Sequence, residues 1–208
     1  MVRNALILLA ALAVPAVAQA PQMPKTAPGA PDAKRVQAGT YKVDPNHTQV
    51  LFEINHLGFS EYSGMFVEPS GTLTLDPAHP AAAKVDIAFP IAKVRTTVAG
   101  LDAHLQTPDF FDAAKFPEGR FVSTRIVATG TTATISGDLT IHGVTKPVTL
   151  NARFIGAGTM AMGGPAKLNI GFQATTTIKR SDWGMSMGIP LVGDTVKLTI
   201  NAAFAKEG

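Results

Sequence analysis

Apolar and polar residues alternate along most of this chain, and this period of two constrains its fold more than any other feature. Phe52 and Ile54 fall on one face of an extended chain, and Glu53 between them falls on the other. Successive side chains of a β-strand point to opposite faces, so this pattern predicts strands with one apolar and one polar side. It recurs in Tyr41–Val43, Val50–His56, Thr72–Leu75, Lys84–Phe89, Phe121–Val127, Thr134–Ile141, Val148–Phe154, Lys167–Phe172 and Val196–Asn201.

One-sided strands at this spacing are typical of antiparallel sheets, with one face on a core and the other in water. The pattern predicts an all-β sandwich or barrel of about eight to ten strands. Helical spacing is confined to residues 98–111, where Leu101 and Leu105 precede Pro108. We therefore expect one all-β domain with short helical insertions near residues 98–112.

The first twenty residues have the layout of a secretory signal peptide. Arg3 supplies a positive start, an unbroken apolar run follows at 5–14, and small residues come next. A membrane-spanning helix needs about 20 apolar residues, so we expect export without a permanent membrane anchor. Cleavage is expected after Ala18 or Ala20.

Residues 21–38 are expected to form a Pro/Ala-rich linker. Four prolines occur between positions 21 and 31, and the stretch has no apolar periodicity. The folded domain is then expected over residues 39–206.

The chain contains no cysteine, which excludes disulfides, thiolate metal sites and a cysteine nucleophile. The formal net charge is +3, but no run of five or six Lys or Arg residues exists to contact a nucleic acid. We expect no nucleic-acid partner.

Motifs of common enzymes are missing from the sequence, and no two histidines are four residues apart. A metal or enzyme site built from His56, His104 and His142, with Asp102, is one hypothesis. The alternative is that these histidines bond to backbone and loop groups. We expect no catalytic residue, no metal and no cofactor.

Aromatic residues gather between two predicted strands. Phe110, Phe111 and Phe116 are predicted either to plug one end of the core or to line the end of an apolar cavity. A second group, Lys179, Arg180 and Trp183, lies in a loop near the C-terminus. This loop is predicted to be either a solvated turn with a packed indole or a rim that holds a polar ligand head.

The alternation also predicts which strand residues face inward. A shift of one residue would reverse each set. The inward residues, expected to line any ligand cavity, are Phe52, Ile54, Leu73, Ile87, Phe89, Leu139, Ile141, Leu168, Ile170 and Phe172.

Several segments, in this order and spacing, resemble the YceI family of bacterial lipid-binding-like proteins. They are Asp44–Val50, His56–Ser60, Asp102–Leu105, Asp109–Asp112, Gly137–Val148 and Ile178–Gly184. The resemblance implies an eight-stranded, lipocalin-like antiparallel β-barrel in the periplasm. It also implies a long isoprenoid or other amphiphilic chain inside the barrel, although the ligand varies within the family.

The function expected is therefore a periplasmic binding or carrier protein for a long-chain amphiphile such as a polyisoprenoid or a fatty-acid derivative, not an enzyme. Eight strands enclose an interior that side chains just fill or that holds one small ligand. The alternative is an envelope stress-linked protein with a packed barrel and a protein partner, and a homodimer also stays open. Cavity volume distinguishes them, because a hollow barrel favours the carrier.

Overall fold

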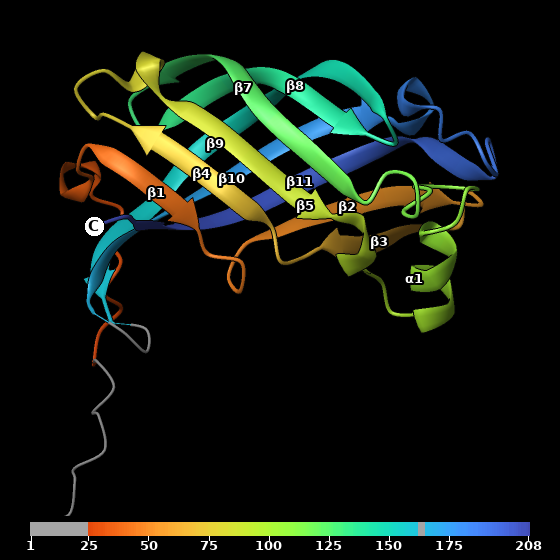
Figure 1. The fold of residues 1–208 in the computed structure, drawn as a ribbon, viewed down its shortest axis with the longest axis horizontal. Coiled ribbons are helices and arrows are strands. Elements are labelled where there is room, and N and C mark those ends of the chain that lie inside the picture. The colour runs from red at the N-terminus through yellow and green to blue at the C-terminus, as the bar shows by residue number, and fades with distance from the viewer. Residues whose placement is uncertain (1–24, 162–164) are drawn as a thin grey trace, which may run out of the picture.

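The computed structural model describes residues 25–161 and 165–208, and nearly all of them belong to one curved sheet (Figure 1). The expected signal peptide and its cleavage sites lie outside the described residues. The strands are β1 Gly39–Val43, β2 Gln49–His56, β3 Ser60–Phe66, β4 Ser70–Leu75, β5 Lys84–Pro90, β6 Val94–Arg95, β7 Glu118–Thr129, β8 Thr132–Ile141, β9 Val144–Met160, β10 Lys167–Lys179 and β11 Val192–Lys206.

Eight of these strands close into a barrel. Their order is β1-β4-β5-β7-β8-β9-β10-β11, and β11 pairs with β1 to complete the ring. All pairings are antiparallel. The expected eight-stranded antiparallel barrel is confirmed.

The remaining strands continue barrel strands rather than form a second layer. β11 is long enough to pair with β1 near its C-terminus and with β2 along the rest of its length. β3 then pairs with β2, and β6 pairs with β3. These three strands lengthen the barrel toward the end that carries the helix.

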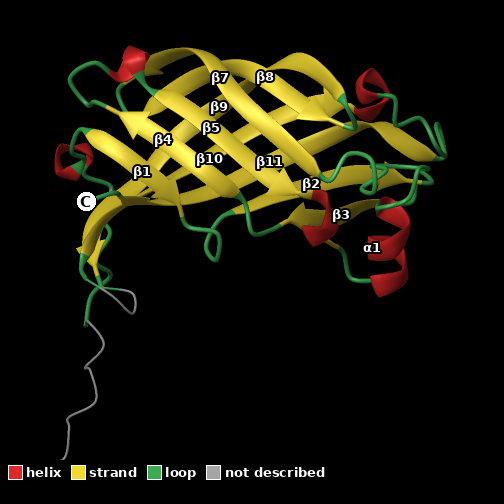
Figure 2. Ribbon diagram, in the orientation of Figure 1, coloured by secondary structure: helices red, strands yellow, loops and turns green. Residues whose placement is uncertain are grey.

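Helical structure is short and lies at the ends of the barrel (Figure 2). The one α-helix among the described residues is α1, Ala99–Leu105, inside the predicted region. The 3₁₀ turns are η1 Ala33–Arg35, η2 Pro80–Ala82, η3 Ile91–Lys93 and η4 Arg180–Trp183. We call the end with α1 the α1 end, and the end with η1 and η2 the N-terminal end.

Part of the expected linker packs on the barrel. Ala30 pairs with Ala157 of β9 through two backbone hydrogen bonds of 3.1 and 2.9 Å. The side chain of Val36 contacts the core, and Asp32 caps η1 by accepting a hydrogen bond from the backbone N–H of Lys34. The proline-rich composition of this segment did not indicate these contacts.

Two apolar clusters fill the parts of the interior that are packed. The larger one lies toward the α1 end and includes Phe66, Ile91 and Trp183. The smaller one closes the N-terminal end around Tyr41, whose side chain is fully buried. The Tyr41 hydroxyl donates to the carbonyl of Gln37 at 2.6 Å, and burial raises its pKa.

Within residues 25–161 and 165–208, no helix combines the length and the apolar character needed to cross a membrane.

The close approach of β4 to β5 at Gly71 leads to a prediction about stability. Gly71 has a φ of +125°, and a methyl group there would overlap the carbonyl of Asp86. We expect Gly71→Ala to lower the free energy of unfolding by about 2 kcal/mol, from backbone strain and overlap. Urea unfolding followed by circular dichroism measures this change.

Gly100→Ala is the matched control. Gly100 lies in α1 with nothing near the position of an added Cβ atom. Alanine is favoured over glycine in helices by up to about 1 kcal/mol, so this variant should be unchanged or slightly more stable. Equal unfolding midpoints for the two variants would contradict the strain at Gly71.

Candidate ligand cavity

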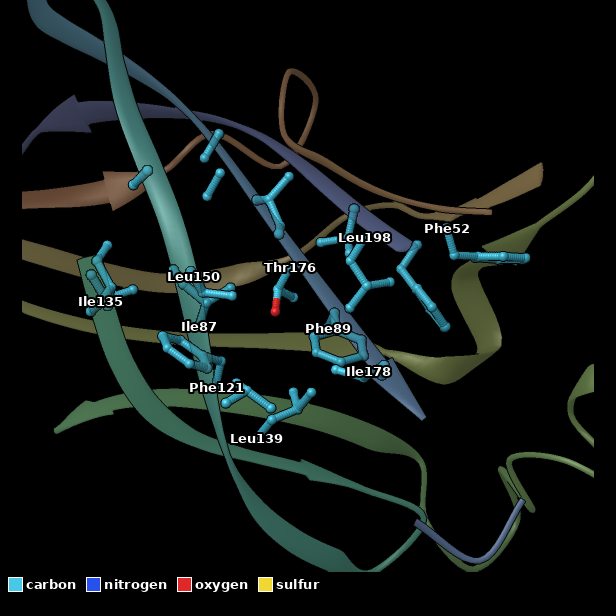
Figure 3. Close-up of a pocket in the computed structure, with 18 of the residues that line it drawn as sticks. Phe52, Ile87, Phe89, Phe121, Ile135, Leu139, Leu150, Thr176, Ile178 and Leu198 are labelled. Atoms are coloured by element: carbon cyan, nitrogen blue, oxygen red, sulfur yellow. The ribbon is translucent and has the colours of Figure 1, made fainter. Parts of the chain in front are cut away.

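The interior of the barrel holds a cavity of about 830 Å³, which is lined by residues from both ends of the barrel. This volume lies toward the upper part of the range for small-molecule sites, which is roughly 300–1,000 Å³. Figure 3 shows apolar side chains from opposite walls, among them Phe121, Leu139 and Leu198, pointing into the same space. The wall is almost entirely apolar, and Thr176 is one of its few polar side chains.

The inward faces follow from the strand period. On β10 and β11 every even-numbered residue from Phe172 to Ile178 and from Val196 to Phe204 lines the cavity. A bulge in β7 between Ser123 and Arg125 shifts the register, so the inward-facing residues change from odd-numbered to even-numbered positions. Phe121 therefore faces inward before the bulge and Ile126 after it.

Three inward phenylalanines place their rings against glycines of neighbouring strands. Phe52 covers Gly64, its direct partner across β2 and β3, and Phe89 covers Gly119 in the same way across β5 and β7. Phe121 covers Gly137 on β8. In each case a methyl group on the glycine would overlap the ring. The rings therefore occupy the wall and leave the centre of the barrel open.

Most of the residues predicted to face inward lie on the cavity wall. Their contact with a ligand stays a prediction. Those on the wall are Phe52, Ile54, Leu73, Ile87, Phe89, Phe110, Phe111, Leu139, Ile141 and Phe172.

Three predicted lining residues are not on the wall. Leu168 and Ile170 belong to the cluster that closes the N-terminal end, so they face inward beyond the cavity. Phe116 lies at the β8–β9 turn, where its ring packs edge-on against His142 at 5.1 Å and covers Gly143. Phe116 is therefore not on the cavity wall, and it packs on the β8–β9 turn instead.

Arg180 lines the cavity but serves the fold rather than standing free at a rim. It is 5% exposed, and its guanidinium donates to the carbonyls of Met185, Val192 and Gly193 at 2.8–2.9 Å. Burial lowers its pKa. This guanidinium holds the loop that connects β10 to β11.

The same loop is fixed from its other side by Asp194. Its carboxylate accepts hydrogen bonds from the backbone N–H and the hydroxyl of Ser181, at 2.9 and 2.8 Å. These bonds hold the pKa of Asp194 below its usual range.

Trp183 and Lys179 do not form the predicted ligand rim. Trp183 is 2% exposed, and its indole N–H donates to the carbonyl of Leu139 at 3.1 Å, outside the cavity wall. Lys179 is exposed at the end of β10 and is also absent from the wall. Of the two alternatives for this loop, the packed indole agrees with the structure, because the turn η4 directs the indole into the core.

The histidine hypothesis is not supported by the positions of the three rings. His56 and His104 lie on the cavity wall at the α1 end, while His142 bonds to the carbonyl of Trp183 at 3.0 Å, off the wall. The described residues contain no group of three His, Cys, Asp or Glu side chains placed to hold a metal.

The cavity is covered at the α1 end by α1 and the loop that follows it. Leu101 and Leu105 of α1 contribute to the wall. Asp102 fixes the start of the helix by accepting from the backbone N–H and the hydroxyl of Thr96, at 2.6 and 2.7 Å. His104 pairs with Asp109 of the loop at 2.8 Å.

Several wall residues were not among the predicted site residues. They include Leu150, Thr176, Ile178, Leu198 and Ile200. Their alternation was visible in the sequence, and extending each predicted strand would have identified them. Tyr62 of β3 also lines the wall, but the polar and glycine residues around it gave no strand signal.

An eight-stranded antiparallel barrel around an apolar cavity is the architecture of a lipocalin-like binding protein. The sequence model of the YceI-like domain matches residues 41–204. The chain therefore belongs to the YceI-like family.

Relatives in Pseudomonas are similar over most of their length. A UPF0312 protein of Pseudomonas fluorescens is 40% identical over 177 residues, which is 81% of this chain and 88% of the relative. A UPF0312 protein of Pseudomonas putida is 39% identical over 178 residues, covering 84% and 91% of the two chains.

Solved structures share the fold. The Campylobacter jejuni YceI protein matches with a TM-score of 0.64 and 33% identity, over 74% of this chain and 90% of that one. A polyisoprenoid binding domain from Saccharophagus degradans matches with a TM-score of 0.60 and 16% identity, over 80% and 98%. The second likeness concerns the fold alone.

The hydrogen bonds of Arg180 predict a large effect on stability. Arg180→Met keeps an unbranched side chain of related length but leaves three backbone carbonyls without their donor. We expect the free energy of unfolding to fall by about 3 kcal/mol or more. Denaturant unfolding measures this loss.

The neighbouring Lys179→Met variant is the control. Lys179 is exposed, so its replacement should change the free energy of unfolding by less than about 0.5 kcal/mol. If Arg180→Met were as stable as Lys179→Met, the structural role assigned to Arg180 would be wrong.

Proposed function

We propose that this protein binds and carries a long-chain amphiphile inside its barrel. The observation that carries the proposal is the apolar cavity of about 830 Å³. A packed barrel with a protein partner requires a filled interior, so the open cavity favours the carrier over that alternative.

Burial of hydrocarbon supplies a large part of the free energy that such a complex needs, and longer chains supply more. Each buried CH₂ contributes roughly 0.8 kcal/mol, so three isoprene units give on the order of 10 kcal/mol before the entropic cost of association. A micromolar complex needs about 8 kcal/mol net. The apolar wall therefore provides much of the affinity for a chain.

The family supports a hydrophobic ligand. The Saccharophagus degradans neighbour is described as a polyisoprenoid binding domain, and this chain shares its fold. A polyisoprenoid or a related lipid chain is thus the class of ligand we propose. We also propose a binding role rather than a catalytic one, because the polar groups at the α1 end hold the loops together.

We propose that the protein acts in the periplasm after removal of an N-terminal signal peptide. The charged start, the apolar run and the small residues of 1–20 support export. The wholly cysteine-free sequence then relies on the closed sheet for its stability outside the cytoplasm.

Thr176 allows the cavity to be filled without changing the outer surface. Its side chain points into the cavity from β10 (Figure 3). We expect Thr176→Phe to weaken the binding of a fluorescent farnesyl probe by at least about tenfold, because the new ring occupies the space of the chain. A fluorescence titration of ligand-stripped protein measures the change.

Thr175→Phe is the matched control, since Thr175 is exposed on the outer face of the same strand. This variant should bind the probe like the original protein. Thermal unfolding of both variants verifies that they fold. Probe binding by Thr176→Phe at the original affinity would show that the chain does not lie in the barrel.

The protein's own ligand can be recovered from a Gram-negative host. We expect the protein in the periplasmic fraction, with a mass that corresponds to a start at Gln19 or Pro21. Extraction with organic solvent followed by mass spectrometry should release an isoprenoid or acyl chain. A barrel that is empty after purification and also takes up no farnesyl or acyl probe would refute the carrier proposal.

A further inference from the structure

Exposed apolar side chains gather at the α1 end. Nine large hydrophobic side chains are exposed among residues 25–161 and 165–208, and six of them lie in three loops at this end. The other three are spread over the outer wall. The six, with their exposed fractions, are Phe59 (89%), Leu191 (64%), Val98 (52%), Met187 (49%), Leu57 (43%) and Ile189 (37%).

These three loops are joined to one another around the cavity. The backbone N–H of Leu57, in the β2–β3 turn, donates to the carbonyl of Leu191 at 2.7 Å. The hydroxyl of Tyr62 bonds to that of Thr97 at 3.2 Å, which ties β3 to the segment before α1. Met187 and Tyr62 both line the cavity. The exposed residues therefore lie together at the α1 end of the cavity. We call the segments 54–60, 96–101 and 184–193, which contain these loops and the adjoining ends of strands and helix, the apolar rim.

The apolar rim carries no charge. None of its three segments contains Asp, Glu, Lys or Arg. Exposed loops of soluble proteins are normally rich in charged residues, and contiguous exposed apolar side chains mark an interaction surface. An uncharged rim matches a partner that is apolar rather than one of opposite charge.

The N-terminal end provides an internal comparison. Residues near its turns also line the cavity, among them Ala33 and Pro80. That end carries Asp32, Arg35 and Asp76 on its turns, and the exposed hydrophobic residues nearest to it, Val127 and Ile155, lie on strands β7 and β9 rather than in its turns. Proximity to the cavity alone therefore does not account for the apolar rim.

We propose that the apolar rim docks onto the surface of a lipid bilayer. The proposal rests on the carrier function for its purpose, because a water-insoluble chain must enter the cavity from a membrane. A rim inserted among the acyl chains would join the cavity to the bilayer interior. The chain could then move between them without crossing water.

The size of the rim favours a bilayer over a second protein chain. A stable protein interface uses roughly 20–30 residues on each side. The rim offers six large apolar side chains on separate loops. Shallow insertion into a membrane interface requires only a small apolar surface and gives weak, reversible binding.

The experiment uses ligand-stripped full-length mature protein and vesicles of phosphatidylcholine. We expect co-sedimentation that does not weaken between about 0.1 and 1 M NaCl, because uncharged contacts are not screened by salt. The double variant F59D/L191D should bind the vesicles at least about tenfold more weakly, since each charge must leave water.

The control is the double variant V127D/I155D. Val127 and Ile155 are exposed apolar residues too, at 46% and 43%, but they lie on the outer wall. This control should bind vesicles like the original protein. Equal binding by the two double variants, or binding only to anionic vesicles at low salt, would overturn the proposal.

Two further measurements separate the proposal from its alternatives. Light scattering coupled to size-exclusion chromatography reports the oligomeric state. A dimer that F59D/L191D converts to a monomer would assign the rim to a second copy of the chain and overturn bilayer docking. The cavity-filled variant T176F should still bind vesicles, so docking can hold even where the carrier function fails.

Discussion

The barrel depends on the seam where β11 meets two different strands. β1 and β2 lie end to end along the same edge of β11, and residues 44–48 interrupt the ladder between them. The side chain of Thr48, 3% exposed, fills that break. Its hydroxyl donates to the carbonyl of Ala203 at 3.1 Å and accepts from the N–H of the same residue at 3.0 Å. The Thr48 side chain thus makes the two hydrogen bonds that a neighbouring strand's backbone would otherwise make with Ala203. The sheet therefore closes without an unpaired edge at this point. For a chain without disulfides, this closure is the main constraint that keeps eight strands in one ring.

Closure determines how much of the interior can stay empty. A ring of eight strands leaves a lumen that ordinary side chains would fill. Here glycines on β3, β7 and β8 let large rings lie against the wall, as Phe52 does over Gly64. The larger packed cluster shares Phe89, Phe121 and Leu139 with the cavity wall, and the smaller one lies at the N-terminal end. Many hydrophobic residues of the chain therefore pack against one another in the core and also present a surface to the cavity.

Strand alternation predicted the fold and most of the cavity wall, because inward and outward faces are a local property of each strand.

Alternation did not predict side-chain positions where the backbone departs from the regular strand. Trp183 and Arg180 follow directly on β10, and the turn η4 directs them into the interior, so the alternation could not decide between a packed indole and a ligand rim. The loop before Phe116 likewise left the position of its ring open. β3 was missed because Ser60, Ser63 and Gly64 resemble a turn, although pairing with β2 makes the segment a strand. Tertiary pairing, which the sequence does not display, decided the case of β3.

The two ends of the cavity differ in how firmly they are covered. At the N-terminal end, Tyr41 is fully buried and its hydroxyl bonds to Gln37. The segment before β1 also pairs with β9, through the backbone bridge between Ala30 and Ala157. At the α1 end the cover is a seven-residue helix that has no buried residue and no side-chain cap at its N-terminus. Segments with few buried apolar contacts open at a small free-energy cost compared with the core. The thinner cover thus lies over the end that carries the uncharged apolar loops. Under the proposed carrier function, a ligand that passes at this end would displace α1 and its loop and would leave the seam at Thr48 closed.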